Sequence, residues 1–314
     1  PTRNILMKRS LAQNGLLTLK GIAMGAADIV PGVSGGTIAF ITGIYEELIS
    51  SINNINLGAL KVLRKDGLKA FWQHVNGTFF LFLFVGIGVS VLGLAKIVRY
   101  LLENEAVLTW SFFFGLIVAS AILIGKTISK WTIPVITAFA LGTIAAMYIT
   151  SIETTASVSG NWYIFISGCI AICAMILPGI SGAFILVLMG SYHIVLKALD
   201  NKDIMTIAVF LTGCVVGLLS FVRLLKFLFT KYKELTIAVL TGFMIGSLYK
   251  VWPWKVNVGD APLVVHSDGR EDWMMTNVLP QDFAGDPKLI FAIGCAIIAL
   301  ILVLGLERLG SKKA

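Results

Sequence analysis

The stretch Pro31-Gly32-Val33-Ser34-Gly35-Gly36 occurs a second time in the chain as Pro178-Gly179-Ile180-Ser181-Gly182-Ala183. A Pro-Gly pair ends a helix, because proline lacks a backbone donor and glycine adopts conformations that other residues resist. The serine that follows is a favourable N-cap for a new helix. Each copy therefore predicts a helix, a break and a second helix.

The residues around both copies are strongly apolar. Of the 314 residues, 57% are hydrophobic and 13% are charged, and the mean hydropathy is +0.89. Apolar runs near the bilayer-spanning length recur, so the composition predicts an all-α polytopic membrane protein. Non-helical backbone at membrane depth occurs only where it is buried in protein or lines a watery cavity. We therefore expect the two breaks to lie at the functional site.

The helices on either side of each break are too short to cross a membrane. Residues 16–30 and 34–49 would form helices of roughly 22 Å, against a hydrocarbon core of about 30 Å. We expect them to enter and leave on one side, as a re-entrant hairpin over 16–49. The second copy predicts the same hairpin over 163–197.

The chain divides into two halves with one plan. The first half, 1–150, adds an interfacial helix and three spans, predicted at 57–75, 79–102, 106–125 and 132–150. The second half, 151–314, adds three spans and an outer loop, predicted at 205–229, 235–250, 288–306 and 251–287. Residues that match between the halves are Gly21/Gly168, Gly43/Gly190, Tyr45/Tyr192, Gly86/Gly213 and Gly115/Gly242. A hairpin adds no crossing and three spans follow it, so we expect inverted repeats with a transport site at their interface.

The distribution of charge orients the chain. If the N-terminus is cytoplasmic, the inner segments hold 17 of the 25 lysines and arginines but five of the 17 acids. This obeys the positive-inside rule and places both termini in the cytoplasm. The net charge of +8 then reflects orientation and contact with anionic membrane lipids, so no nucleic-acid partner is expected. Whether the chain forms a homo-oligomer stays open.

Each break should leave backbone donors free at the start of the new helix. The residues expected to bind a substrate phosphate there are Ser34, Gly35, Gly36, Thr37, Ser181 and Gly182. A helix N-terminus attracts anions, and glycines let a phosphate approach the backbone. The alternative is that these small residues only allow tight helix packing. Two matched copies favour contact with substrate.

Two matched basic pairs follow, Lys96 with Arg99 and Arg223 with Lys226. The members of each pair are three residues apart and so share a helix face. Under the inverted arrangement the pairs lie near opposite leaflets, where each would dock a phosphate headgroup. The alternative is that both pairs extend to lipid headgroups.

Asp28 is the sole acid in the first hairpin arm, and its counterpart in the second is Met175. An ionisable group at membrane depth is costly and is a functional candidate by default, here for coupling to a proton or a sodium ion. The alternative is a structural carboxylate near a helix end. We find neither a metal-binding set nor a nucleophile with its base, so no metal, cofactor or catalytic residue is expected.

The segment Gly25-Ala26-Ala27-Asp28-Ile29-Val30-Pro31-Gly32-Val33-Ser34-Gly35-Gly36-Thr37, with Leu177-Pro178-Gly179-Ile180-Ser181-Gly182, resembles the PopT family of polyprenyl-phosphate translocases. The resemblance covers essentially the whole chain. It implies a flippase in the prokaryotic cytoplasmic membrane that returns undecaprenyl phosphate from the outer to the inner leaflet, for reuse in cell-wall glycan synthesis. It also implies transport driven by an ion gradient, a role that would suit Asp28.

Two alternative functions stay open at this stage. One is a small-anion secondary transporter or channel that uses the same helix ends. The other is an intramembrane enzyme that acts on a lipid phosphate, although its reactive groups are not recognisable in the sequence.

Overall fold

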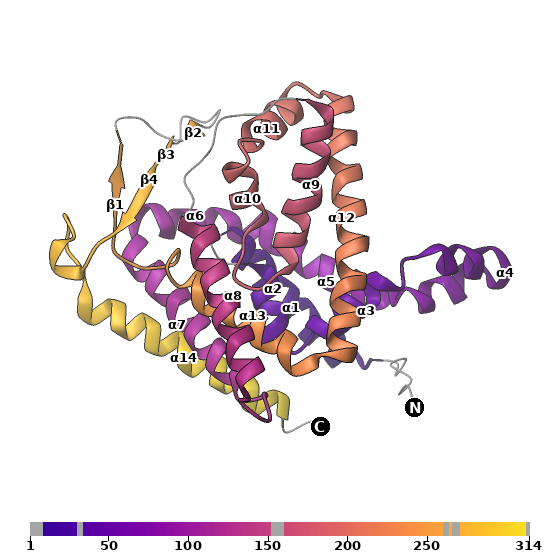
Figure 1. Cartoon of the computed structure of the whole chain (residues 1–314), viewed down its shortest axis with the longest axis horizontal. Coiled ribbons are helices and arrows are strands. Elements are labelled where there is room, and N and C mark those ends of the chain that lie inside the picture. Colours follow the sequence, from indigo (N-terminus) through magenta and orange to yellow (C-terminus); the bar gives the residue numbers. More distant parts are fainter. Residues whose placement is uncertain (1–8, 30–33, 152–159, 260–263, 266–270, 312–314) are drawn as a thin grey trace.

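The computed structural model describes residues 9–29, 34–151, 160–259, 264–265 and 271–311. The described chain is mainly helical (Figure 1), and four of its helical segments are long and apolar enough to cross a membrane. These segments are Gly77–Leu94, Ala106–Gly125, Ile133–Ser151 and Ile204–Lys231. The prediction of an all-α polytopic membrane protein is confirmed.

The first half contains eight α-helices among its described residues. They are α1 (Leu11–Ile29), α2 (Gly35–Ile41), α3 (Tyr45–Asn53), α4 (Leu57–His74), α5 (Gly77–Val89), α6 (Ala95–Asn104), α7 (Ala106–Gly125) and α8 (Ile133–Ser151). A short π-helical segment, Ser90–Leu94, joins α5 to α6. The predicted span 79–102 therefore corresponds to α5, the π segment and α6 together.

The second half repeats this order without a counterpart of α4. Its helices are α9 (Asn161–Ile176), α10 (Gly182–Leu188), α11 (Tyr192–Asp200), α12 (Ile204–Lys231), α13 (Lys233–Ser247) and α14 (Leu289–Ser311). Between α13 and α14 lie two small antiparallel ladders, β1 (Lys255–Val258) with β4 (Met274–Asn277) and β2 (Val264–Val265) with β3 (Glu271–Asp272). In the longer ladder Lys255 lies opposite Asn277.

The returning arm of each hairpin differs from the sequence prediction. We expected single helices over 34–49 and 181–197, but each arm is divided, into α2 and α3 and into α10 and α11. The divisions fall at Gly43 and Gly190, whose φ angles are 72° and 66°. This left-handed conformation is accessible to glycine and ends the helix. The matched pair of glycines thus marks a second break in each hairpin.

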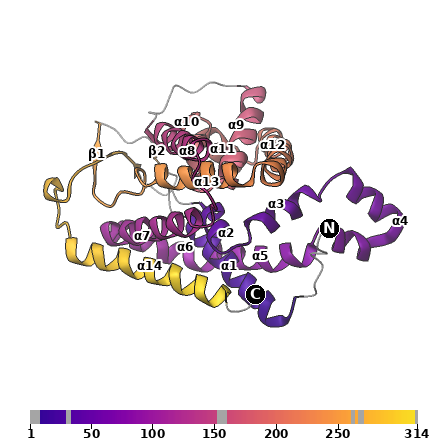
Figure 2. The same ribbon diagram turned by 60° about the horizontal axis from the view of Figure 1, so that its bottom comes forward.

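The predicted interfacial helix 57–75 also differs. The structure has α4 there, but the helix is interrupted at Gly67, where φ is 80° and ψ is −178°. The interruption turns the segment back on itself, and it projects away from the other helices (Figures 1 and 2). The predicted helix is therefore present but kinked at Gly67, and its place at the membrane interface stays a prediction.

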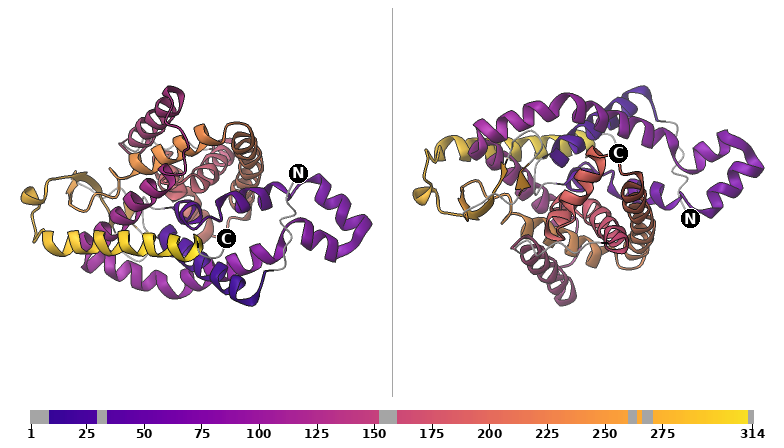
Figure 3. Two further views of the ribbon diagram at one scale, coloured as in Figure 1. Left: turned by 90° about the horizontal axis from the view of Figure 1, so that it is seen from below. Right: turned by 90° about the horizontal axis from the view of Figure 1, so that it is seen from above.

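Contacts between the helices are reciprocal between the halves. Helix α1 packs on α5, as α9 packs on α12. The second span of each half packs on the third span of the other, α7 on α14 and α13 on α8, and these neighbours run side by side in Figures 2 and 3. Two halves related by a two-fold axis would make this pattern of contacts.

The matched glycines lie at matched crossings. A Cβ added at Gly86 would collide with the carbonyl oxygen of Thr18 in α1, and one added at Gly213 with that of Phe165 in α9. Small residues of this kind let two helix backbones approach closely in a membrane protein. The same residue type therefore sets the same helix–helix contact in both halves.

Candidate functional site

The two Pro-Gly turns are in direct contact. The side-chain hydroxyl of Ser34 donates a hydrogen bond to the carbonyl oxygen of Met175, at 3.0 Å. The backbone amide of Gly179 donates to Oγ1 of Thr37, at 2.9 Å. Because Ser34 and Thr37 are 1% and 0% exposed, this contact lies inside the protein. Residues 30–33 of the first turn lie outside the described residues.

The first turn binds its own carboxylate. The amide of Gly35 donates to Oδ1 of Asp28 at 2.6 Å, and the amide of Gly36 donates to Oγ of Ser34 at 3.1 Å. The amide of Thr37 donates to the carbonyl oxygen of Ser34 at 2.9 Å. The expectation that these three donors are free is therefore wrong. Asp28 precedes the turn and reaches across it, so the first helix start already carries an anion.

The second turn is built differently, because Met175 stands where the first copy has Asp28. Oγ of Ser181 accepts from the amide of Phe184 at 3.4 Å. Within the described chain, the amides of Gly182 and Ala183 have no hydrogen-bond partner. Both residues are at least partly exposed, whereas Gly35 is buried. The two turns are thus chemically unequal, and the second is the one with open donors.

The carboxylate of Asp28 has no cationic partner among the described residues. Asp28 is exposed, although its carboxylate accepts the hydrogen bond from Gly35. An anion without a counter-ion next to the contact between the turns can take up a proton or a cation. The assignment of ion coupling to Asp28 stays a prediction.

The basic pairs are not brought to the turns. Lys96 is exposed on α6, and the side chain of Arg99 lies outside the described residues. Arg223 is exposed on α12, and Lys226 is half-buried there. No hydrogen bond or ion pair joins the described side chains of these pairs to the described residues of either turn. Their role in docking phosphate stays a prediction.

An apolar groove of about 410 Å³ runs between α12 and α13 and reaches the second turn. One end is formed by Leu177, which directly precedes Pro178, and the other includes Tyr232 at the end of α12. The other lining residues are Phe221, Leu225, Leu228, Leu235, Thr236, Val239, Leu240 and Phe243. Such a groove suits a hydrocarbon chain whose polar end lies at the second turn.

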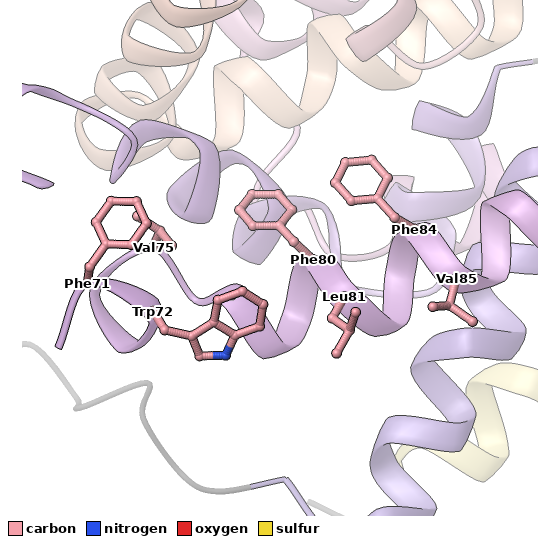
Figure 4. Close-up of a pocket in the computed structure, with 8 residues that line it drawn as sticks. Phe71, Trp72, Val75, Phe80, Leu81, Phe84 and Val85 are labelled. Carbon is pink, nitrogen blue, oxygen red and sulfur yellow. The ribbon is translucent and has the colours of Figure 1, made fainter. Parts of the chain in front are cut away.

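A second apolar groove, of about 490 Å³, lies on α4 and α5 (Figure 4). Its side chains come from the end of α4, where Trp72 lies, and from α5, where Phe80 and Phe84 lie. Its lining residues belong to neither turn. This groove is therefore separate from the contact between the turns.

The sequence reasoning missed two residues beside the second turn. Lys250 and Lys255 flank the segment Val251-Trp252-Pro253-Trp254. The two lysines that bracket a pair of tryptophans were the available signal. No cluster of three or more metal-ligating His, Cys, Asp or Glu side chains occurs in the described part of the chain.

Known proteins resemble this chain along most of its length. A model of the undecaprenyl phosphate translocase-like family matches residues 24–262, a range that contains both turns. A polyprenyl-phosphate transporter of Vibrio cholerae serotype O1 is 44% identical over 299 residues, which cover 94% of this chain and 96% of the relative. A polyprenyl-phosphate transporter of Staphylococcus aureus is 33% identical over 254 residues, which cover 75% of this chain and 85% of the relative. No solved structure matches the chain.

Proposed function

The chain belongs to the undecaprenyl phosphate translocase-like family, and we propose that it is a flippase that returns undecaprenyl phosphate from the outer to the inner leaflet of the cytoplasmic membrane. Two relatives named as polyprenyl-phosphate transporters support the substrate class. The observation that carries the proposal is the contact between the two turns, next to an apolar groove. The lipid carrier would then be available again for cell-wall glycan synthesis.

Of the two turns, the second receives the phosphate before the first in this account. The amides of Gly182 and Ala183 are open, and the hydroxyl of Ser181 lies beside them. Hydrogen bonds to a charged phosphate oxygen are stronger than those between neutral groups. The prenyl chain follows the groove between α12 and α13, so the headgroup and the tail are held by adjacent parts of the protein.

Asp28 competes with the phosphate at the first turn. The amide of Gly35 donates its hydrogen bond to this carboxylate. Without Asp28, the same amide could donate to a phosphate oxygen. A proton or a sodium ion on Asp28 would weaken that hydrogen bond and reduce the repulsion of a phosphate. Binding of the ion and of the phosphate at the first turn are therefore favourably coupled. No cofactor is needed beyond the coupling ion.

The reciprocal helix contacts support two inverted repeats that meet at the turns. In this arrangement each hairpin enters from its own leaflet, and both termini are cytoplasmic. The basic pairs Lys96/Arg99 and Arg223/Lys226 would then attract the headgroup on opposite sides. The relatives' names support transport, and transport without chemical change of the lipid is the activity to be measured.

The experiment is transport of labelled undecaprenyl phosphate in proteoliposomes, followed by its accessibility to an impermeant phosphatase. Ala183→Asp places a carboxylate where the phosphate is expected, and Ala183→Asn is the neutral control of the same size. An acid in the first helical turn is compatible with the helix, so the aspartate variant should fold. Charge repulsion should slow its transport by about tenfold or more relative to Ala183→Asn.

Two results would refute the proposal. One is equal transport by the two Ala183 variants, which would show that the phosphate does not bind at the second turn. The other is wild-type protein that leaves the lipid's sidedness unchanged. Passage of a small anion, or release of phosphate from the lipid by purified protein, would then identify the channel or the enzyme instead.

A further inference from the structure

Two lysines lie close together at the end of α13. Nζ of Lys255 donates to the carbonyl oxygen of Lys250 at 2.6 Å. The same ammonium group lies 3.7 Å from the ring centroid of Trp110 in α7. The ammonium group of Lys250 lies 4.4 Å from the ring centroid of Phe184 in α10. Both lysines are partly buried, and each is placed against an aromatic face.

Neither lysine has an acidic partner among the described residues. No carboxylate of the described chain forms an ion pair with Lys250 or Lys255, although three other basic residues are paired. Burial, together with the smaller effect of the nearby charge of Lys250, lowers the pKa of Lys255 to about 7. A cation–π contact offsets part of the loss of solvation but does not neutralise a charge. An anion between the two would therefore be stabilised by both lysines.

The lysines are next to the second turn. Lys250 contacts Phe184, which is three residues after Ser181. A Cβ added at Gly179 would lie 2.9 Å from Oγ of Ser247, which is three residues before Lys250. The segment that carries Lys255 belongs to the acidic loop that sequence analysis places on the outer side. The lysines thus stand between that side and the open amides of the second turn.

We propose that Lys250 and Lys255 form a binding site for a phosphate monoester, which receives the lipid headgroup before it reaches the second turn. This inference rests on the proposed function. A phosphate dianion suits two neighbouring lysines whose ammonium groups have no carboxylate partner in the described chain, because lysine binds phosphate as a point charge without a fixed geometry. The faces of Trp110 and Phe184 limit the access of water, which strengthens the electrostatic attraction. Inorganic phosphate has the same chemistry and is the competing ligand.

The test uses the full-length protein in nanodiscs with Lys250→Met and Lys255→Met. Methionine keeps an unbranched apolar chain and removes the charge, and Lys61→Met on the exposed face of α4 is the control. Binding of labelled undecaprenyl phosphate and of inorganic phosphate is measured separately. Each variant should lose about tenfold in affinity for both ligands, since one charge-assisted contact is removed. The control should bind as the wild type does, and the lipid should bind more tightly than the inorganic ion.

Thermal unfolding without ligand separates this role from a structural one. Removing an unpaired, partly buried charge should leave the midpoint unchanged or raise it, whereas loss of a structural cation–π contact would lower it. Normal binding of the lipid by both methionine variants would overturn the inference, as would binding of inorganic phosphate alone. The proposed function is tested separately by the transport rates of the Ala183 variants. If these rates differ while the lysine variants bind the lipid normally, only the lysine site is wrong.

Discussion

Oγ1 of Thr37 accepts a hydrogen bond from the backbone amide of Gly179, although the two residues are 142 positions apart in the chain. Together with the bond from Ser34 to Met175, it ties the two turns to each other. The turns therefore cannot separate without leaving polar groups unpaired inside the protein. This cost couples the two hairpins, so a change in the conformation of one turn should alter the conformation of the other.

Replacing Thr37 by valine should destabilise the contact between the turns. The amide of Gly179 would lose its acceptor, at a cost of about 1–3 kcal/mol. We expect a lower thermal midpoint in nanodiscs and slower lipid transport. Thr37→Ser keeps the hydroxyl and should retain most of both. A valine variant as stable as the serine variant would show that this hydrogen bond contributes nothing to the fold.

Replacing Asp28 by asparagine should separate its charge from its hydrogen bond. Asparagine keeps an oxygen that accepts from the amide of Gly35 but cannot bind a proton or a sodium ion as a carboxylate does. Transport should become independent of an imposed proton or sodium gradient, with little change in stability. Glu103→Gln, at an exposed position on α6, is the control. Persistence of the wild-type gradient dependence in Asp28→Asn would assign the coupling elsewhere.

Filling the groove between α12 and α13 should affect long prenyl chains most. Leu228→Trp adds volume inside the 410 Å³ groove, and Leu81→Trp adds it to the groove on α4 and α5. We expect the first variant to slow transport of undecaprenyl phosphate more than that of a short-chain prenyl phosphate. The second should leave both rates near the wild-type values. The opposite ranking would mean that the tail lies along α4 and α5.

Replacing Gly86 by alanine should push α5 away from α1. The added methyl group would overlap the carbonyl oxygen of Thr18, and overpacking of this kind costs about 1–3 kcal/mol. Gly88→Ala lies on the same helix with open space around it, so it should be neutral or mildly stabilising. Thermal unfolding of the two variants in detergent measures the difference. Equal midpoints would contradict the close approach of these helices.

The hairpins were predictable because their cause is local. A proline followed by glycine disfavours continuation of a helix, and the serine that follows, Ser34 or Ser181, caps the next helix at both sites. Gly43 and Gly190 were matched in the sequence, but their backbone conformation was not inferred. A lone glycine is tolerated in many helices and indicates a break only weakly.

The bonding within the site was not predictable from the sequence. That Asp28 caps Gly35 depends on how the chain turns between them, so the donors were expected to be free. Lys250 and Lys255 lie over aromatic rings that belong to α10 and α7, and these helices are distant from the lysines in the chain. Periodicity and spacing carry no information on such contacts, because they arise only when the two halves pack together.

The central claim is that the turns hold the phosphate of a prenyl lipid. An experimental structure of the protein with undecaprenyl phosphate in nanodiscs tests it most directly. We predict phosphate density within hydrogen-bonding distance of the amides of Gly182 and Ala183, or between Lys250 and Lys255, with the prenyl chain between α12 and α13. Density for the headgroup remote from both turns and both lysines, for example beside the α4–α5 groove, would contradict the account.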